Sequence, residues 1–308
     1  MGRFSVWLGT VVLFVIALPR LPTSHVSGQQ PAFRSGTELV LLPVTVRDSS
    51  GQAVRDLIAA DFRIFENGLP QQVAMFSGDR VPTALSLLVD TSASMQENLA
   101  SAQAAASAIV GRLGPRDTGQ VVAFNSTVDI RQDFTNDHQR LRDAIASTHA
   151  QGATALYNAV YIALRSLQRS RPTMTSELRR EAIIVLSDGQ DTASLVAFED
   201  VLDAARRSQT LIYTIGLQVS ATAAAQPTRD GQFVLRKLAD QTGGRAYTVS
   251  SLGQLDNVYS EIYDTITASY MLAYVPSTNA PGGAWRTISV AVDRPGVSAR
   301  TRAGYFRR

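Results

Sequence analysis

The sequence has no cysteine, and its 308 residues include only three histidines. Without thiols the chain can form no disulfide, hold no thiolate-bound metal and use no cysteine nucleophile. The histidines, His25, His138 and His149, do not pair at the spacing of metal ligands. That spacing argues against a zinc site or a histidine-rich metal centre.

Lysine is also nearly absent, since Lys237 is the sole example. The sequence pI is about 9.4, but the arginines that raise it are scattered along the chain and form no basic patch. Removing residues 1–28 would take away Arg3 and Arg20 and no acid, so the formal charge would fall from +3 to +1. We therefore expect no nucleic-acid partner.

The N-terminus has the pattern of a secretory signal peptide, which we assign to residues 1–28. Arg3 precedes the apolar stretch 4–18, whose 15 residues would span roughly 22 Å as a helix, less than the roughly 30 Å of a bilayer core. An uncleaved N-terminal anchor is the alternative, and membrane contact is expected only in that case. Either way the body of the protein is expected to be secreted or to lie in the periplasm or cell envelope.

Both ends of the remaining chain have a β pattern. Residues 29–37 are a polar linker, and residues 38–81 contain a strand at 39–47, a turn at 48–51 and a hairpin around Glu66-Asn-Gly. Residues 269–308 contain apolar segments at 270–276, 285–294 and 298–306. Neither flank is long enough for a good core alone, so we expect the two to pair as one small sandwich with the middle of the chain inserted. Two separate β appendages are the alternative.

Between the flanks, over residues 82–268, buried strands alternate with amphipathic helices. The most apolar strands are expected at 83–90, 181–188 and 210–217. Near-continuous apolar strands joined by helical crossovers indicate a parallel sheet that is covered on both faces. The sequence therefore predicts an α/β domain with a doubly wound, mostly parallel, Rossmann-like sheet.

Several oxygen-bearing side chains are expected at one edge of this sheet. Asp90 and Asp188 each end a buried strand, Ser92 and Ser94 follow Asp90 at alternate positions, and Thr154 lies in a loop between two helices. In open α/β sheets, ligands bind outside the carboxyl ends of the strands. Two carboxylates and three hydroxyls are hard donors that suit an octahedral cation such as Mg²⁺ or Mn²⁺.

These five residues, in this order, resemble the metal-ion-dependent adhesion site of von Willebrand factor type A (VWA) domains, and the order of strands and helices is similar over about residues 82–268. The resemblance implies that Asp90, Ser92, Ser94, Thr154 and Asp188 hold a cation directly or through water. It also implies that an aspartate or glutamate of a protein partner completes the coordination. The flanks look like those of secreted bacterial proteins described as VWFA-related.

Simpler interpretations exist for each part of the motif. Asp90 and the two serines could cap the following helix. Thr154 could be the N-cap of the next helix, and Asp188-Gly189 could be only a turn. Asp191 and Thr192 are expected to form an Asx-type turn and a helix cap, so we leave them out of the ligand set.

The sequence favours a binding module and not an enzyme. Two alternatives are a scaffold protein with a stabilising metal and a Mg²⁺-dependent phosphohydrolase. A strand-end aspartate such as Asp90 suits nucleophilic attack in such hydrolases, but Ser92 stands where a second aspartate would act as acid and base. The sequence contains no P-loop, no G-x-G-x-x-G motif and no evident Ser/His/Asp arrangement.

Overall fold

The computed structural model describes Gly2 and five longer stretches of the chain. Beyond Gly2, the predicted signal peptide and linker lie outside the described residues, and so does Asp188. The five stretches are residues 39–171, 179–187, 190–217, 229–277 and 283–306. No helix within them combines the length and the apolar character that crossing a membrane requires.

The middle of the chain forms a six-stranded sheet with the order β10-β9-β8-β5-β6-β7. Neighbouring strands are parallel except for β7, which runs antiparallel to β6. Along β5, Leu85 and Leu87 pack on one face while Ala84 and Leu88 pack on the other. Burial on both faces explains the continuous apolar pattern. The strands are β5 (Thr83–Asp90), β6 (Thr118–Phe124), β7 (Val128–Thr135), β8 (Arg180–Ser187), β9 (Leu211–Leu217) and β10 (Ala246–Val249).

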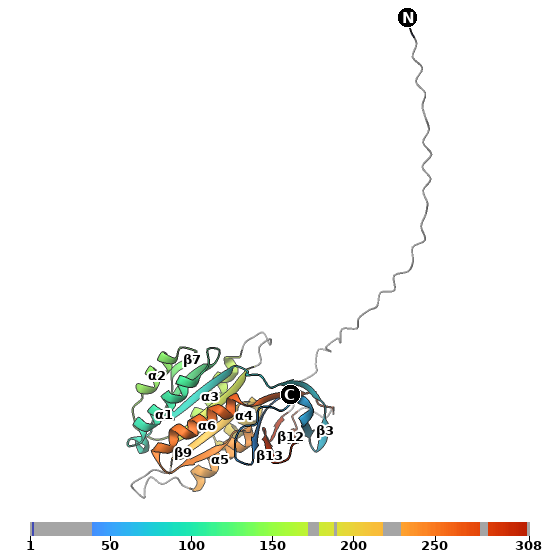
Figure 1. The fold of residues 1–308 in the computed structure, drawn as a ribbon. Helices are drawn as coiled ribbons and strands as arrows, with labels where there is room; N and C mark the ends of the chain where they lie inside the picture. The colour runs from blue at the N-terminus through green and yellow to red at the C-terminus, as the bar shows by residue number, and fades with distance from the viewer. Residues whose placement is uncertain are drawn as a thin grey trace. The chain divides into compact units, whose positions relative to one another are not determined.

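Helices cover both faces of this sheet. One apolar core joins one face to α1, α2 and α6, and a second core joins the other face to α3, α4 and α5. Figure 1 shows α1 and α6 lying side by side. The helices are α1 (Leu99–Arg112), α2 (His138–Ala146), α3 (Leu156–Arg169), α4 (Phe198–Ser208), α5 (Arg229–Thr242) and α6 (Leu255–Thr267), with short 3₁₀ turns η1 (Ala59–Asp61), η2 (Ala93–Met95) and η4 (Leu252–Gln254).

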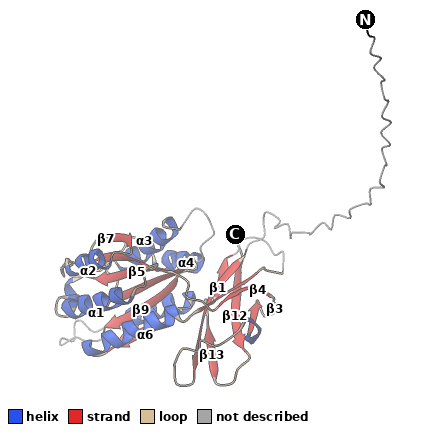
Figure 2. Cartoon of the chain, turned by 45° about the horizontal axis from the view of Figure 1, so that its top comes forward, coloured by secondary structure: helices blue, strands red, loops and turns tan. Residues whose placement is uncertain are grey.

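Strands from both flanks interleave in two antiparallel four-stranded sheets. Their orders are β13-β1-β11-β4 and β14-β12-β2-β3, so β11 from the C-terminal flank lies between two strands of the N-terminal flank. Figure 2 shows β1, β12 and β13 gathered together although they are far apart in the sequence. The strands are β1 (Val40–Asp48), β2 (Phe62–Glu66), β3 (Leu69–Gln71), β4 (Val73–Ser77), β11 (Tyr270–Tyr274), β12 (Trp285–Val292), β13 (Val297–Arg300) and β14 (Gly304–Phe306).

The two flank sheets share one apolar core, which includes Leu42, Ile64 and Leu272. The fold class predicted from the sequence is therefore confirmed, both for the doubly wound sheet and for the flanking antiparallel sheets. The predicted hairpin is also present, because β2 and β3 are joined at Asn67–Gly68, where both residues have positive φ. The domain bounds stay a prediction, since residues Glu38–Arg308 form one compact unit.

Two elements differ from the sequence-based expectation. The strand expected over residues 298–306 is two strands, because β13 pairs with β1 and β14 pairs with β12 in the other sheet. The Ala-rich sequence that begins at residue 96 predicts a helix from that point, but α1 begins at Leu99, because the 3₁₀ turn η2 and three further turn residues precede it. Ser92 and Ser94 thus lie in the turn that follows Asp90, the last residue of β5.

Candidate functional site

Asp90 is the last residue of β5 and its side chain is fully buried. Its Oδ1 accepts a hydrogen bond from the backbone N–H of Ser92 (2.9 Å), and its Oδ2 accepts one from the hydroxyl of Ser187 (2.6 Å). Ser187 ends the neighbouring strand β8 and directly precedes Asp188. The carboxylate is therefore held by one donor from its own turn and one from the adjacent strand.

Ser92 and Ser94 lie in the turn that follows Asp90. Ser92 is buried and Ser94 is exposed, and their Oγ atoms are 3.1 Å apart. The residue between the aspartate and the first serine anchors this turn, because both the N–H and the hydroxyl of Thr91 donate to the carbonyl of Phe124 at the end of β6 (2.7 and 3.1 Å). The turn is thus fixed to the strands on both sides of β5.

The loop that carries Thr154 is tied directly to this turn. The N–H of Gln151 donates to the carbonyl of Thr91 (2.8 Å), and the N–H of Ala93 donates to the carbonyl of Gly152 (2.9 Å). Gly152 has a φ of +73°, and a Cβ there would lie 2.6 Å from the Ser126 hydroxyl, so this position requires glycine. The structure therefore brings the Thr154 loop to the same edge as Asp90.

Thr154 itself is buried and is held by the segment that follows β8. Its N–H donates to the hydroxyl of Thr192 (3.0 Å). Its carbonyl accepts from the N–H groups of Thr192 and Ala193 (2.8 and 3.0 Å). Asp188 precedes this segment and lies outside the described residues. The structure thus unites Asp90, Ser92, Ser94 and the Thr154 loop, and it does not describe the position of Asp188.

The helix-capping interpretation does not account for the serines or for Thr154. The N-cap of η2 is Ser92 and that of α1 is Asn98, and neither makes a side-chain capping hydrogen bond. The N-cap of α3 is Ala155, so the expectation that Thr154 could be this cap is wrong. The turn interpretation of Asp188-Gly189 lies outside the described residues.

Asp191 performs a structural task, as the sequence indicates. Its Oδ1 accepts hydrogen bonds from the N–H of Tyr157 in the first turn of α3 (3.1 Å) and from the hydroxyl of Ser194 (2.6 Å). The Ser194 hydroxyl in turn accepts from the N–H of Asn158 (3.0 Å). Asp191 therefore caps a helix, but the helix is α3, which precedes it in the chain, and the Thr192 hydroxyl binds the N–H of Thr154.

Among the residues that the structure describes, no group of three or more histidine, aspartate or glutamate side chains could hold a metal ion. The described residues bring to this edge the Asp90 carboxylate, the hydroxyls of Ser92 and Ser94, and the loop that carries Thr154. Such a set offers hard oxygen donors and suits cations that prefer oxygen ligands.

Comparison with known proteins identifies the family. Residues 85–261 match the model of the von Willebrand factor type A domain. Because the match covers more than half of the 308 residues, the chain belongs to this family. Domains of the family often bind a metal ion and mediate protein–protein interactions.

Individual relatives are distant. A UPF0353 protein of Mycolicibacterium paratuberculosis is 26% identical over 207 residues, which cover 61% of this chain and 63% of the relative. A von Willebrand factor type A structure from Catenulispora acidiphila is 13% identical, with a TM-score of 0.52 and coverage of 89% of this chain and 75% of that one. Proximal thread matrix protein 1 of the mussel byssus, solved with a zinc-occupied MIDAS motif, is 18% identical, with a TM-score of 0.49 and coverage of 65% and 49%. The chain thus spans less than two thirds of the UPF0353 relative.

Proposed function

We propose that this protein is an extracytoplasmic binding module that holds a divalent cation at the carboxyl edge of its central sheet and uses the cation to capture an acidic group of a protein partner. One observation carries the proposal. The backbone hydrogen bonds from Gln151 to Thr91 and from Ala93 to Gly152 join the two segments that bear the candidate ligands. These segments are about 60 residues apart in the sequence, so the contact is no local turn, and this supports a site shared by the two segments.

The spacing of the donors fits an octahedral ion. Adjacent ligands at about 2.1 Å from Mg²⁺ lie about 3 Å from one another, and the Oγ atoms of Ser92 and Ser94 are 3.1 Å apart. Hydroxyl and carboxylate oxygens favour Mg²⁺ or Mn²⁺ over softer metals. The donor set therefore supports a hard divalent cation.

Each residue has a distinct role in this proposal. Asp90 supplies a buried negative charge, and the donors Ser92 N–H and Ser187 hydroxyl orient it. Ser92, Ser94 and Thr154 supply neutral oxygens, and Asp188 supplies the second carboxylate. A dication with two carboxylates carries no net negative charge, so an anionic ligand from outside is not repelled and can take an open coordination position. Ser94 is exposed, so a partner can approach from its side.

The binding experiment separates this function from a scaffold role. The full chain, immobilised and incubated with the native cell-envelope fraction, is expected to retain its partner in Mg²⁺ and to release it after metal removal. A scaffold whose flank sheets make the contacts would retain the partner without metal. Metal-independent retention would therefore contradict the proposal. Hydrolysis of a generic phosphate ester by the same preparation would favour the phosphohydrolase alternative.

Thr154→Ala is expected to weaken Mg²⁺ binding to the full chain about tenfold, because one neutral oxygen is lost from the site. Thr154→Ser keeps the oxygen and is expected to restore most of the affinity. Isothermal titration calorimetry measures both. Thr248→Ala is the matched control, since Thr248 is exposed on the edge strand β10. Equal Mg²⁺ affinity of wild type and Thr154→Ala would show that Thr154 is not a ligand. Parallel titrations of the wild type with Mn²⁺ and Zn²⁺ identify the preferred ion.

A further inference from the structure

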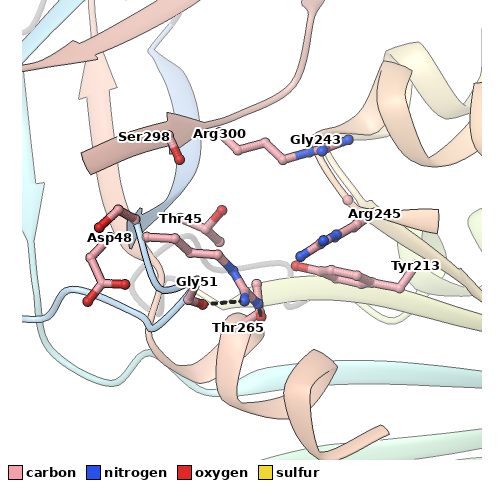
Figure 3. A pocket seen from close by; sticks show the side chains of 12 residues that line it. Thr45, Asp48, Gly51, Tyr213, Gly243, Arg245, Thr265, Ser298 and Arg300 are labelled. Carbon is pink, nitrogen blue, oxygen red and sulfur yellow. Dashed lines mark hydrogen bonds between the residues drawn. The ribbon is translucent and has the colours of Figure 1, made fainter. Parts of the chain in front are cut away.

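A pocket lies between the central sheet and the flank sheets, and Asp90 is not among the residues that line it. We call it the seam pocket, and its volume is about 340 Å³. Figure 3 shows side chains entering it from both parts of the molecule, with Tyr213 from β9 facing Asp48 and Ser298 of the flank sheets. A pocket of this size can hold a small ligand.

Three arginines line the seam pocket at increasing depth. The side chains of Arg245 and Arg300 are 49% and 42% exposed, whereas that of Arg47 is 19% exposed. Arg47 and Arg245 share the single carboxylate of Glu261 (2.9 and 3.2 Å), and Arg300 pairs with Asp240 (2.6 Å). Three guanidinium groups thus share two carboxylates as ion-pair partners, and Asp48 is a third acid in the wall.

The remaining acid of the wall, Asp48, is occupied by its own turn. Its Oδ1 accepts hydrogen bonds from the N–H and the hydroxyl of Ser50 (2.9 and 2.6 Å) and from the N–H of Gln52 (2.9 Å). The hydrogen bond from the Ser50 hydroxyl is the main cause that lowers the pKa of Asp48. Asp48 therefore stays charged, so the three arginines and three acids balance, and the preference for an anion depends on the unpaired donors at the inner end of the pocket.

Buried donors lie at the inner end of the pocket. Tyr213 is 1% exposed, and its hydroxyl has no hydrogen-bond partner among the described residues. Burial raises the pKa of Tyr213, so the hydroxyl keeps its proton and can donate it. The charge of Arg180 acts on this hydroxyl, and Arg180 is itself buried with Nε and Nη1 unpartnered within the described part of the chain. Unpaired buried donors favour a ligand that brings acceptors.

One wall of the pocket consists of bare backbone. A Cβ on Gly244 would lie 1.9 Å from the carbonyl oxygen of Ile212, and Gly243 has a φ of +86°. A side chain at Gly244 would require movement of the β9 backbone, and one at Gly243 would require movement of the backbone at Thr301 and Arg302. The two glycines therefore let the turn after α5 pack closely on β9 and on the backbone of residues 301–302, which fixes this wall next to Arg245.

We propose that the seam pocket binds a compact oxyanion, a phosphate or carboxylate group of a small ligand, between Arg300 and Arg245 at its mouth and Tyr213 at its inner end. Planar guanidinium groups match the paired oxygens of phosphates and carboxylates. The volume exceeds that of a single phosphate and leaves room for a second anionic group. Because the walls come from both the flank sheets and the central sheet, a bound oxyanion stabilises their contact.

The test is calorimetric titration of the metal-free full chain with pyrophosphate and, separately, with citrate, at low and constant ionic strength. We expect saturable binding with one site, and the two titrants assign the phosphate or the carboxylate class. Tyr213→Phe and Arg300→Gln are each expected to weaken binding about tenfold, because each removes a donor to a charged acceptor. Arg294→Gln is the control, because Arg294 is exposed, pairs with Asp56 and lies outside the pocket, so this variant is expected to bind both anions with wild-type affinity.

Thermal unfolding of the same proteins provides the second readout. A bound ligand raises the melting temperature through linkage, so either titrant is expected to raise it in wild type and to raise it less in Tyr213→Phe, which removes a single oxygen. A purely structural role for the arginines would give no saturable heat with either anion. Absence of binding, or equal affinity in wild type and both variants, would overturn the proposal.

Discussion

Asp90→Asn is expected to weaken Mg²⁺ binding to the full chain at least about 100-fold, because a buried carboxylate is replaced by a neutral group of the same shape. Asp90 is fully buried, and the hydrogen bonds from Ser92 and Ser187 hold both of its oxygens in place. The amide of asparagine keeps the volume but supplies no charge to the cation. Isothermal titration calorimetry with MgCl₂ measures the change.

Asp129→Asn is the matched control for this substitution. Asp129 is exposed on β7, where it pairs with Arg131 (2.9 Å). Mg²⁺ affinity is expected to be the same in this variant as in wild type. Circular dichroism of Asp90→Asn tests whether the variant keeps the wild-type fold. An unchanged Mg²⁺ affinity in folded Asp90→Asn would show that the cation, if bound, lies elsewhere.

Glu66→Gln is expected to lower the free energy of unfolding of the flank sheets by about 3–5 kcal/mol, because it leaves the charge of Arg286 buried without its counter-charge. Glu66 and Arg286 are 2% and 1% exposed and form an ion pair. The hydroxyls of Tyr274 and Tyr305 also donate to Glu66 Oε2 (2.6 and 2.9 Å). Urea unfolding followed by the fluorescence of Trp285, which lies on β12 beside Arg286, measures the loss.

The effect of Glu66 depends on pH in a defined direction. Burial acts to raise the pKa of Glu66, but the hydrogen bonds from Tyr274, Arg286 and Tyr305 outweigh it, so the pKa is lowered. The stabilisation is then present above the ordinary glutamate pKa of about 4.3 and is lost as the pH falls through the lower folded value. The difference between wild type and Glu66→Gln is expected to shrink below that range.

The exposed pair Asp56–Arg294 provides the comparison for this buried pair. Both side chains are well exposed and their closest atoms are 2.6 Å apart. Solvent screens such pairs, so Asp56→Asn is expected to leave the urea midpoint nearly unchanged. Loss of Glu66 without any change in the midpoint would contradict the assignment of Glu66 as a main stabilising group of the flank sheets.

Part of the fold, including the strand that ends at the candidate site, could be predicted from local patterns. An apolar run that ends in Asp90 indicates a buried strand with a polar end, and parallel strands bring such ends to one edge. Asn67-Gly68 predicts a hairpin because these residues tolerate positive φ. These features depend on residues close in sequence, and the structure contains both.

Other contacts at the site could not be predicted in this way. Ser187 donates to Asp90 from the neighbouring strand, and Thr192 and Asp191 hold Thr154 and the start of α3 from across the sheet edge. Each is a small polar residue in a loop or at a strand end, where many roles are possible. Their partners are decided by the packing of distant segments, for which the sequence has no local signal.

The sequence by itself determined the buried strands, the helices between them and the order of the oxygen-bearing residues, because periodicity and chain order suffice for these. Only the tertiary structure decided that residues 298–306 divide between two sheets and that Arg47, Tyr213 and Arg300 line one pocket. The physical reason is that the pairing of β13 with β1, and the walls of the pocket, join segments more than 80 residues apart in the chain. Their formation depends on how the flank sheets pack against the central sheet, and no short stretch of sequence encodes that packing.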